Sequence, residues 1–178
     1  MLIDGLNFRD DIPGRIGDKI RAGKLYEAEM LHYMQGLFID GDCVDVGCFI
    51  GTHSIFFAKK LGKRVYSFDK FMHEEFHDHI KMNNINDYVK FPYYLLPPLD
   101  LADLVFSKIG LIKIDVDGSD EIDVLESCKK IIKRDKPHIF IEARTDEKLQ
   151  QIKKFLKGYK KIQRFNVTPT YYFRYEKS

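Results

Sequence analysis

Val44-Asp45-Val46-Gly47-Cys48-Phe49-Ile50-Gly51-Thr52 is the stretch that decides the fold of this 178-residue chain. A short apolar run that ends at a glycine indicates a buried strand followed by a turn. Gly47 and Gly51 allow the backbone to turn sharply and to approach a ligand at the start of a helix. The stretch therefore predicts a strand, a loop and a helix, in that order, with a binding site at the loop.

Strands and helices alternate along the chain on both sides of this unit. Apolar residues at helical spacing predict one helix from about residue 15 to residue 38. Further along the chain we expect helices over 51–61, 73–83, 120–133 and 146–157, and strands over 64–68, 88–96, 111–114 and 138–141. This alternation is typical of a mainly parallel sheet with helices on both faces.

The C-terminal part breaks this alternation. Residues 161–167 and 171–175 are two strand-like runs, and the connection Thr168-Pro169-Thr170 leaves no room for a helix. The two runs are therefore expected to pair antiparallel, as a hairpin. The predicted fold is α/β, a three-layer sandwich with a mostly parallel seven-stranded sheet and an antiparallel C-terminal hairpin. It resembles the class I, Rossmann-like methyltransferase fold.

Composition and charge favour one cytoplasmic domain over residues 1–178, with residues 1–40 as a helical segment packed on the core. The net charge is +2, so we expect no nucleic-acid partner. The sequence shows no secretory signal and no apolar run close to the roughly 20 residues of a membrane span, so we expect no membrane partner either. Three cysteines without a signal peptide indicate free thiols.

The glycine spacing identifies the class of ligand. A dinucleotide fingerprint requires a second glycine where this chain has Phe49, and a phosphate-binding loop requires a Gly-Lys-Ser/Thr that is missing. The looser spacing suits S-adenosylmethionine (SAM), with Asp45 available to its ammonium group. Asp69 ends the next strand, eighteen residues after Gly51, where an acid can accept hydrogen bonds from ribose hydroxyls. The alternative is that both glycines are ordinary turn residues and Asp69 an ordinary loop acid.

A second acidic cluster lies at the end of the strand over 111–114. Asp115 and Asp117 are two residues apart, and close carboxylates raise one another's pKa, which suits a general base. Asp115, Asp117 and His53 are therefore the candidate catalytic residues. Lys113 could orient a carboxylate. Asp115 and Glu142, at neighbouring strand ends, could also hold a magnesium ion, but the expectation is a site without a metal.

Several segments resemble the FkbM-type methyltransferases from about Lys24 to Tyr175. The resemblance is carried by Tyr26-Glu27, the glycine loop with His53, Tyr66-Ser67-Phe68-Asp69, Ile112-Lys113-Ile114-Asp115-Val116-Asp117-Gly118, Asp123-Val124-Leu125 and Ile141-Glu142. The chain departs from the family at Asp69, where glutamate is usual, and at Cys48-Phe49, where alanine-asparagine is usual.

The resemblance implies roles for individual residues. Asp45, Gly47 and Gly51 would line the methionine end of SAM, Asp69 would hold the ribose, and Asp115 would face the transferring methyl group. Tyr26 and Glu27 would close the cofactor or substrate pocket. The predicted set of cofactor contacts is Tyr26, Glu27, Asp45, Gly47, Cys48, Phe49, Gly51, Thr52, Asp69, Lys70 and Asp115.

The function that follows is SAM-dependent O-methylation, with S-adenosylhomocysteine as the product. The expected acceptor is a hydroxyl of a sugar, a glycan or a related small metabolite. The alternatives are a nucleic-acid or protein methyltransferase and a SAM-binding module without catalytic activity. A dinucleotide-dependent oxidoreductase would share the fold class but not the glycine spacing. Metal dependence and oligomeric state stay open at this point.

Overall fold

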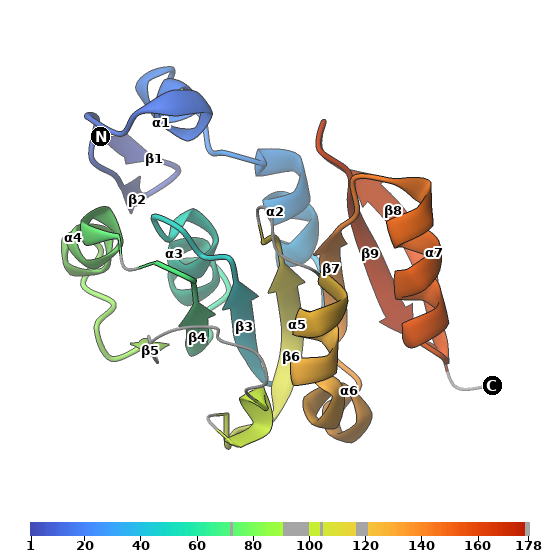
Figure 1. The fold of residues 1–178 in the computed structure, drawn as a ribbon. Helices are drawn as coiled ribbons and strands as arrows, with labels where there is room; N and C mark the ends of the chain where they lie inside the picture. The colour runs from blue at the N-terminus through green and yellow to red at the C-terminus, as the bar shows by residue number, and fades with distance from the viewer. Residues whose placement is uncertain (72, 91–99, 104, 117–120, 177–178) are drawn as a thin grey trace.

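A seven-stranded sheet forms the middle layer of the protein (Figure 1). The computed structural model describes residues 1–176 except 72, 91–99, 104 and 117–120. Along the sheet the strand order is β5-β4-β3-β6-β7-β9-β8. The strands are β3 (Asp42–Val46), β4 (Val65–Phe68), β5 (Val89–Lys90), β6 (Ile109–Ile114), β7 (His138–Glu142), β8 (Tyr159–Phe165) and β9 (Thr170–Tyr175).

The direction of the strands confirms the predicted fold class. Strands β3 to β7 pair in parallel, whereas β9 is antiparallel to both β7 and β8. The C-terminal hairpin is therefore inserted with β9 inside the sheet and β8 at its edge. The parallel strands all point toward the side on which the N-terminal segment lies, so their carboxyl ends face that segment (Figure 1).

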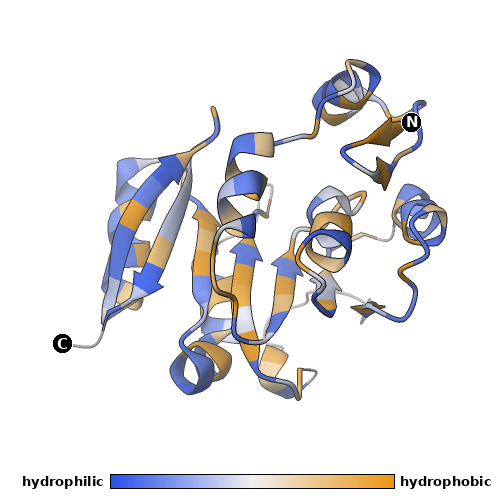
Figure 2. Cartoon of the chain, turned by 180° about the vertical axis from the view of Figure 1, so that it is seen from behind, coloured by the Kyte–Doolittle hydropathy of each residue, from blue (hydrophilic) through white to orange (hydrophobic). Residues whose placement is uncertain are grey.

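Helices cover both faces of the sheet. One face packs against α2 (Ala28–Gln35), α3 (Thr52–Lys59) and α4 (Glu74–Met82), and α1 (Gly14–Arg21) joins the same hydrophobic cluster from beyond the carboxyl ends of the strands (Figure 1). The other face packs against the short 3₁₀ helix η1 (Leu101–Asp103), α5 (Glu121–Ser127), α6 (Lys129–Asp135) and α7 (Asp146–Phe155). Because strand side chains alternate between faces, Cys43 and Leu111 join the first cluster and Val44 and Ile112 the second. In Figure 2 the central strands are mainly hydrophobic, whereas the C-terminal hairpin is more hydrophilic.

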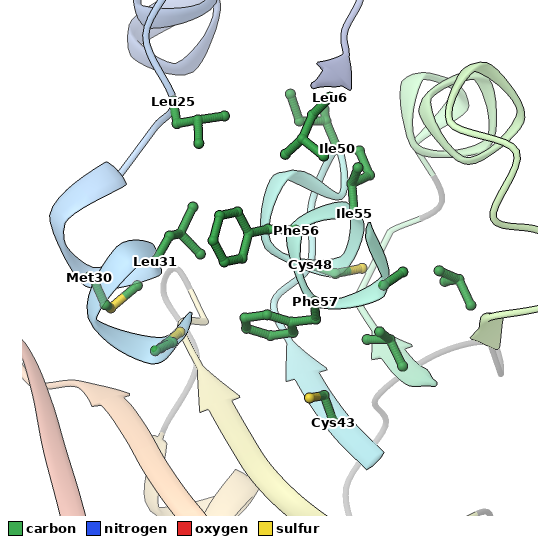
Figure 3. Packing of buried hydrophobic residues seen from close by; sticks show 14 of the residues in the cluster. Leu6, Leu25, Met30, Leu31, Cys43, Cys48, Ile50, Ile55, Phe56 and Phe57 are labelled. Atoms are coloured by element: carbon green, nitrogen blue, oxygen red, sulfur yellow. The ribbon is translucent and has the colours of Figure 1, made fainter. Parts of the chain in front are cut away.

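Helix α3 is the most deeply buried helix of the first face. Every residue from Thr52 to Ala58 is buried, which explains why this helix shows no polar face in the sequence. Phe56 and Phe57 fill the space between β3 and α2, where Phe56 points toward Leu31 (Figure 3). Burial on all sides fixes the start of α3, and with it the glycine loop that precedes the helix.

Three predicted elements need correction. The single helix predicted over 15–38 is two helices, because the chain turns at residues 22–27, where Gly23 and Glu27 have positive φ angles of 69° and 55°. The helix predicted over 120–133 divides at Cys128 into α5 and α6. Of the strand predicted over 88–96, Val89–Lys90 is observed, and residues 91–96 lie outside the described residues.

The N-terminal segment contains a small hairpin that the sequence did not predict. Its strands are β1 (Leu2–Ile3) and β2 (Leu6–Asn7). Buried polar side chains of α4 and of its C-cap residue tie the N-terminal segment to the core: Asn83 Oδ1 accepts from Asn7 N at 2.8 Å and His79 Nε2 accepts from Arg9 N at 3.0 Å. None of the described helices is both long enough and apolar enough to cross a membrane.

Candidate active site

A cavity of about 650 Å³ opens at the carboxyl ends of the parallel strands. Small-molecule sites of α/β proteins lie at this edge of the sheet and have volumes of roughly 300–1,000 Å³. Its walls come from the glycine loop, the ends of β4, β6 and β7, the α1–α2 segment and the β8–β9 turn. The lining residues include Arg15, Tyr26, Glu27, Gly47, Cys48, Phe49, Thr52, His53, Asp69, Lys70, Phe71, His73, Lys113, Asp115, Asp123, Glu142, Arg144, Thr168 and Thr170.

The two glycines of the loop differ in position. Gly47 lines the cavity with φ 80°, and a Cβ atom at this residue would lie 1.7 Å from the carbonyl oxygen of Asp115. Gly51 has φ 85°, and a Cβ there would lie 2.8 Å from the Phe76 ring. Gly51 is not part of the described cavity wall. Gly47 therefore allows the end of β3 to lie close to the end of β6 at the cavity, and Gly51 allows α4 to pack under the loop.

Asp69 holds the glycine loop in place. Its Oδ2 accepts a hydrogen bond from Phe49 N at 2.7 Å, and its Oδ1 accepts one from Phe71 N at 3.0 Å. These bonds fix Phe49 at a positive φ of 46°, with its ring 4.5 Å from that of His73. Each carboxylate oxygen has a second lone pair, so Asp69 can still accept from a ligand in the cavity.

A polar row crosses the sheet beneath the cavity. Ser67, Asp45 and Lys113 are neighbours in the register of β4, β3 and β6 and all face α3. Asp45 Oδ2 accepts from Ser54 Oγ at 2.6 Å, whereas Asp45 Oδ1 has no hydrogen-bond partner among the described residues. The structure thus places the Asp45 carboxylate below the described cavity wall, fully buried, and not on its surface.

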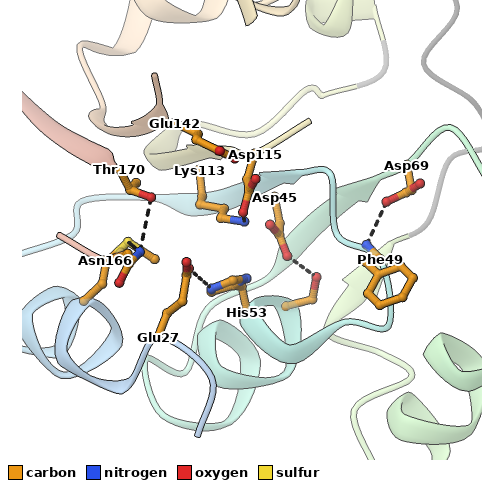
Figure 4. A network of polar contacts seen from close by, with 12 residues as sticks. Glu27, Asp45, Phe49, His53, Asp69, Lys113, Asp115, Glu142, Asn166 and Thr170 are labelled. Carbon is orange, nitrogen blue, oxygen red and sulfur yellow. Dashed lines mark hydrogen bonds and ion pairs between the residues drawn. The ribbon is translucent and has the colours of Figure 1, made fainter. Parts of the chain in front are cut away.

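Lys113 is a buried cation that interacts electrostatically with several carboxylates. Its Nζ lies 3.0 Å from Asp115 Oδ2, and its side chain is 1% exposed (Figure 4). Burial alone would lower the pKa of Lys113, but the charges of Asp115, Asp45 and Glu27 outweigh it and raise that pKa. The ammonium group therefore stays charged and compensates the negative charge at the end of β6.

Asp115 and Glu142 form a hydrogen-bonded carboxyl pair. Burial would raise the pKa of Asp115, but the charge of Lys113 and hydrogen bonds from Glu142 and Lys113 hold it well below its usual range. Burial and the hydrogen bond to Asp115 raise the pKa of Glu142 to about 8, against the opposing effect of Arg144. Near neutral pH Glu142 carries the proton and Asp115 the charge, so Asp115 is a weak base.

Glu27 and His53 form a second pair across the cavity wall. Glu27 Oε2 lies 3.0 Å from His53 Nε2, and the side chains are 7% and 5% exposed. Glu27 reaches this position from a left-handed backbone conformation, a strained geometry that is common at functional sites. The ring of Tyr26 lies edge-on to His53. Both predicted pocket-closing residues, Tyr26 and Glu27, therefore lie at the cavity.

The structure brings together most of the predicted cofactor contacts. Tyr26, Glu27, Gly47, Cys48, Phe49, Thr52, Asp69, Lys70 and Asp115 all line the cavity. Asp117 lies outside the described residues. Sequence reasoning missed the cavity residues Arg15, Arg144, Thr168 and Thr170, since none of them belongs to a motif and only the fold brings their segments together.

A metal ion is not favoured by the described side chains. They contain no group of three or more His, Cys, Asp or Glu side chains that could hold one. The two candidate ligands already have cationic partners, because Asp115 pairs with Lys113 and Glu142 accepts from Arg144 Nε at 2.6 Å. We therefore do not assign a metal to Asp115 and Glu142.

Comparison with known proteins identifies the fold. No protein-family model and no curated protein sequence matches the chain. Among solved structures, precorrin-6y C5,15-methyltransferase of Geobacter metallireducens has a TM-score of 0.65 and 18% identity over 98% of this chain and 95% of that chain. Precorrin 8W decarboxylase of Methanobacterium thermoautotrophicum has a TM-score of 0.66 and 16% identity over 99% and 100%.

The FkbM methyltransferase of Methylobacillus flagellatus has a TM-score of 0.64 and 18% identity over 84% of this chain and 48% of that chain. Structures with the same fold also include an rRNA methylase and a tRNA methyltransferase. The chain thus has the Rossmann-like class I methyltransferase fold. At these identities the comparison establishes the fold, and FkbM-type membership stays a prediction.

Proposed function

We propose that this protein is a SAM-dependent methyltransferase that acts on a hydroxyl group of a sugar, a glycan or a related small metabolite. The observation that carries the proposal is the cavity at the carboxyl ends of β3, β4 and β6, bounded by Gly47 on one side and Asp69 on the other. In this fold class the sheet edge is where a nucleoside ligand binds.

The residues around the glycine loop fit SAM. The missing Cβ of Gly47 allows the chain after β3 to lie against the end of β6 at the cavity, and Asp69 keeps lone pairs for ribose hydroxyls. Negative charge from Asp115 and Glu27 lies on the same cavity and would favour the cationic ammonium and sulfonium groups. SAM would supply the electrophilic methyl group, and the protein would supply the orientation of the acceptor.

His53 is the residue that we assign to proton removal from the acceptor hydroxyl. When His53 Nε2–H donates to Glu27, the other ring nitrogen carries a lone pair. The Glu27 carboxylate then stabilises the imidazolium that forms on proton transfer, as carboxylates do in other His–acid pairs. Asp115, ionised and held by Lys113, would orient the hydroxyl by accepting its hydrogen bond.

Calorimetric titration with SAM and with S-adenosylhomocysteine tests the cofactor assignment. We expect saturable binding of both compounds, which Asp69→Ala weakens by at least tenfold because the substitution removes the ribose acceptor and loosens the loop. Asp87→Ala is the matched control, because Asp87 is an exposed acid that does not line the cavity. Absence of binding to the folded wild-type protein, or equal affinity in Asp69→Ala, would overturn the assignment.

Isotope transfer from methyl-labelled SAM tests the reaction class. Hydroxylated sugars, glycans and small metabolites are offered in parallel with RNA and with protein substrates. Label in a base-stable ether of a small acceptor supports the proposal. Label in RNA or protein alone would replace it with the nucleic-acid or protein alternative. SAM binding with no label in any acceptor would favour a module without catalytic activity.

A further inference from the structure

A second cavity of about 500 Å³ adjoins the first at the N-terminal segment. It lies between α1, the start of α2 and the β8–β9 turn, on the side away from Asp69. Four residues line both cavities, namely Arg15, Tyr26, Glu27 and Thr168. The wall between the two cavities is therefore only one layer of side chains thick, and Glu27, which pairs with His53, is part of it.

The second cavity carries cations that have no ion-pair partner among the described residues. Arg15, Lys19 and Lys24 line it and make no salt bridge or side-chain hydrogen bond among the described residues. Arg15 and Lys19 are four residues apart on α1, so they lie on one face of the helix. Lys24 follows on the turn between α1 and α2 and lines the same cavity.

One of the three acidic residues around this cavity, Asp4, is neutralised within the protein. Asp4 lies 3.0 Å from Lys60 Nζ, whereas Glu27 keeps its negative charge beside a neutral His53. Glu29 is the lining acid without a described ion pair. Three cations without an ion pair among the described residues therefore face two charged carboxylates, Glu27 and Glu29, which leaves a net positive charge over the cavity.

We propose that the second cavity binds an anionic group, a phosphate or a carboxylate, of the methyl acceptor. This inference rests on the proposed function, because it assigns the acceptor end of the same site. The acceptor hydroxyl would lie beside His53 in the first cavity, and the anionic group would lie against Arg15, Lys19 and Lys24. The acceptor class is then a sugar phosphate or a hydroxylated acid, and a neutral sugar would bind less well.

The test is an amide NMR titration of the isotope-labelled full chain without SAM. The probes are glucose 6-phosphate and, in parallel, neutral glucose. We expect saturable shifts at the amides of residues 15–25 and 168 with the phosphate and none with glucose. Lys19→Glu/Lys24→Glu should weaken phosphate binding by at least tenfold, because it replaces two charge-assisted contacts with repulsive charges. Gluconate, a hydroxylated carboxylate, tests the second anion class.

Lys153→Glu/Lys157→Glu is the matched control. Lys153 lies in the last turn of α7 and Lys157 follows the end of that helix, on the opposite face of the sheet, and Lys19 likewise lies in the last turn of α1. The control should keep wild-type affinity. The inference would be overturned by equal weakening in both variants, by shifts spread over all surface lysines, or by shifts of equal size with glucose. Each of these results would mean that the phosphate binds as an adventitious ion only.

SAM titration of the same samples separates this inference from the proposed function. SAM binding without saturable phosphate or gluconate binding overturns the anion site alone. Saturable phosphate binding without SAM binding overturns the proposed function and leaves an anion site next to the cavity. Raised salt should weaken phosphate binding in the wild type, because exposed charges are screened at a Debye length of about 8–10 Å.

Discussion

Glu27 Oε2 and His53 Nε2 lie 3.0 Å apart, although the two residues are 26 positions apart in the chain and belong to different elements. Glu27 precedes α2 and His53 lies in the first turn of α3. Because both side chains are almost fully buried, the pair is kept in a low-dielectric environment. The carboxylate therefore has a strong influence on the orientation and tautomer of the imidazole.

We expect Glu27→Gln to lower kcat by about 10²–10⁴-fold with little change in SAM affinity. The amide can keep a hydrogen bond to His53 but cannot stabilise the imidazolium that proton removal creates. Single-turnover kinetics with the acceptor found in the label screen, together with calorimetry, measure the two quantities. Loss of SAM affinity with unchanged kcat would instead show that Glu27 is a cofactor contact.

Gly47→Ala should destabilise the protein far more than an ordinary Gly→Ala change. Its Cβ would lie 1.7 Å from the Asp115 carbonyl oxygen, so β3 and β6 would have to separate. Gly62→Ala is the control, because Gly62 also has a positive φ, 64°, but its Cβ meets nothing within 4 Å. In urea unfolding we expect a loss of about 1–2 kcal/mol for Gly62→Ala and a clearly larger loss for Gly47→Ala. Similar losses of stability in Gly47→Ala and Gly62→Ala would contradict the close approach of Gly47 to the Asp115 carbonyl.

Local patterns were sufficient to predict most of the fold. The central strands are continuous apolar runs because they are buried on both faces. The C-terminal hairpin follows from two strand-like runs with no room between them for a helix. The long N-terminal helix was wrong because the helical spacing continues across residues 22–27, where Gly23 follows the end of α1 and Glu27 precedes α2 in an αL conformation. This conformation is stabilised by tertiary contacts that no local pattern reports.

The site was predictable where it follows strand ends and unpredictable where it depends on distant segments. Asp69 and Asp115 directly follow β4 and β6, so their place at the cavity follows from the parallel sheet. The proton-sharing partner of Asp115 was expected to be Asp117, which lies outside the described residues. The structure shows Glu142 as a partner, because β7 pairs with β6 in a register that brings their ends together.

Lys113→Met should destabilise the fold by about 3–5 kcal/mol, because it leaves the Asp115 carboxylate buried without its cation. The double variant Lys113→Met/Asp115→Asn should recover part of this loss, since the second change removes the unpaired charge. A double-mutant cycle in urea at neutral pH measures the coupling. Additive losses in the double variant would show that Lys113 acts mainly through Asp45 or Glu27 and not through Asp115.

Glu142→Gln should reduce the pH dependence of stability. The folded state raises the pKa of Glu142 from 4.5 to about 8, so the folded protein keeps a proton that the unfolded chain releases. The free energy of unfolding therefore falls as pH rises through this window, in proportion to the excess protons bound in the folded state. Glutamine keeps a donor toward Asp115 and an acceptor for Arg144 and does not titrate, so this contribution disappears.

The measurement is urea unfolding at several pH values between about 5 and 8. Histidine titrations with lowered pKa values, at His79 and His138, act in the opposite direction, but they are shared by both proteins. The difference between wild type and Glu142→Gln therefore isolates Glu142 and should decrease steadily with rising pH. Glu126→Gln, at an exposed pair with Lys129, should give a flat difference. If the difference in the free energy of unfolding between wild type and Glu142→Gln were also independent of pH, Glu142 would be ionised over the whole pH range. Asp115 would then receive no hydrogen bond from a protonated Glu142.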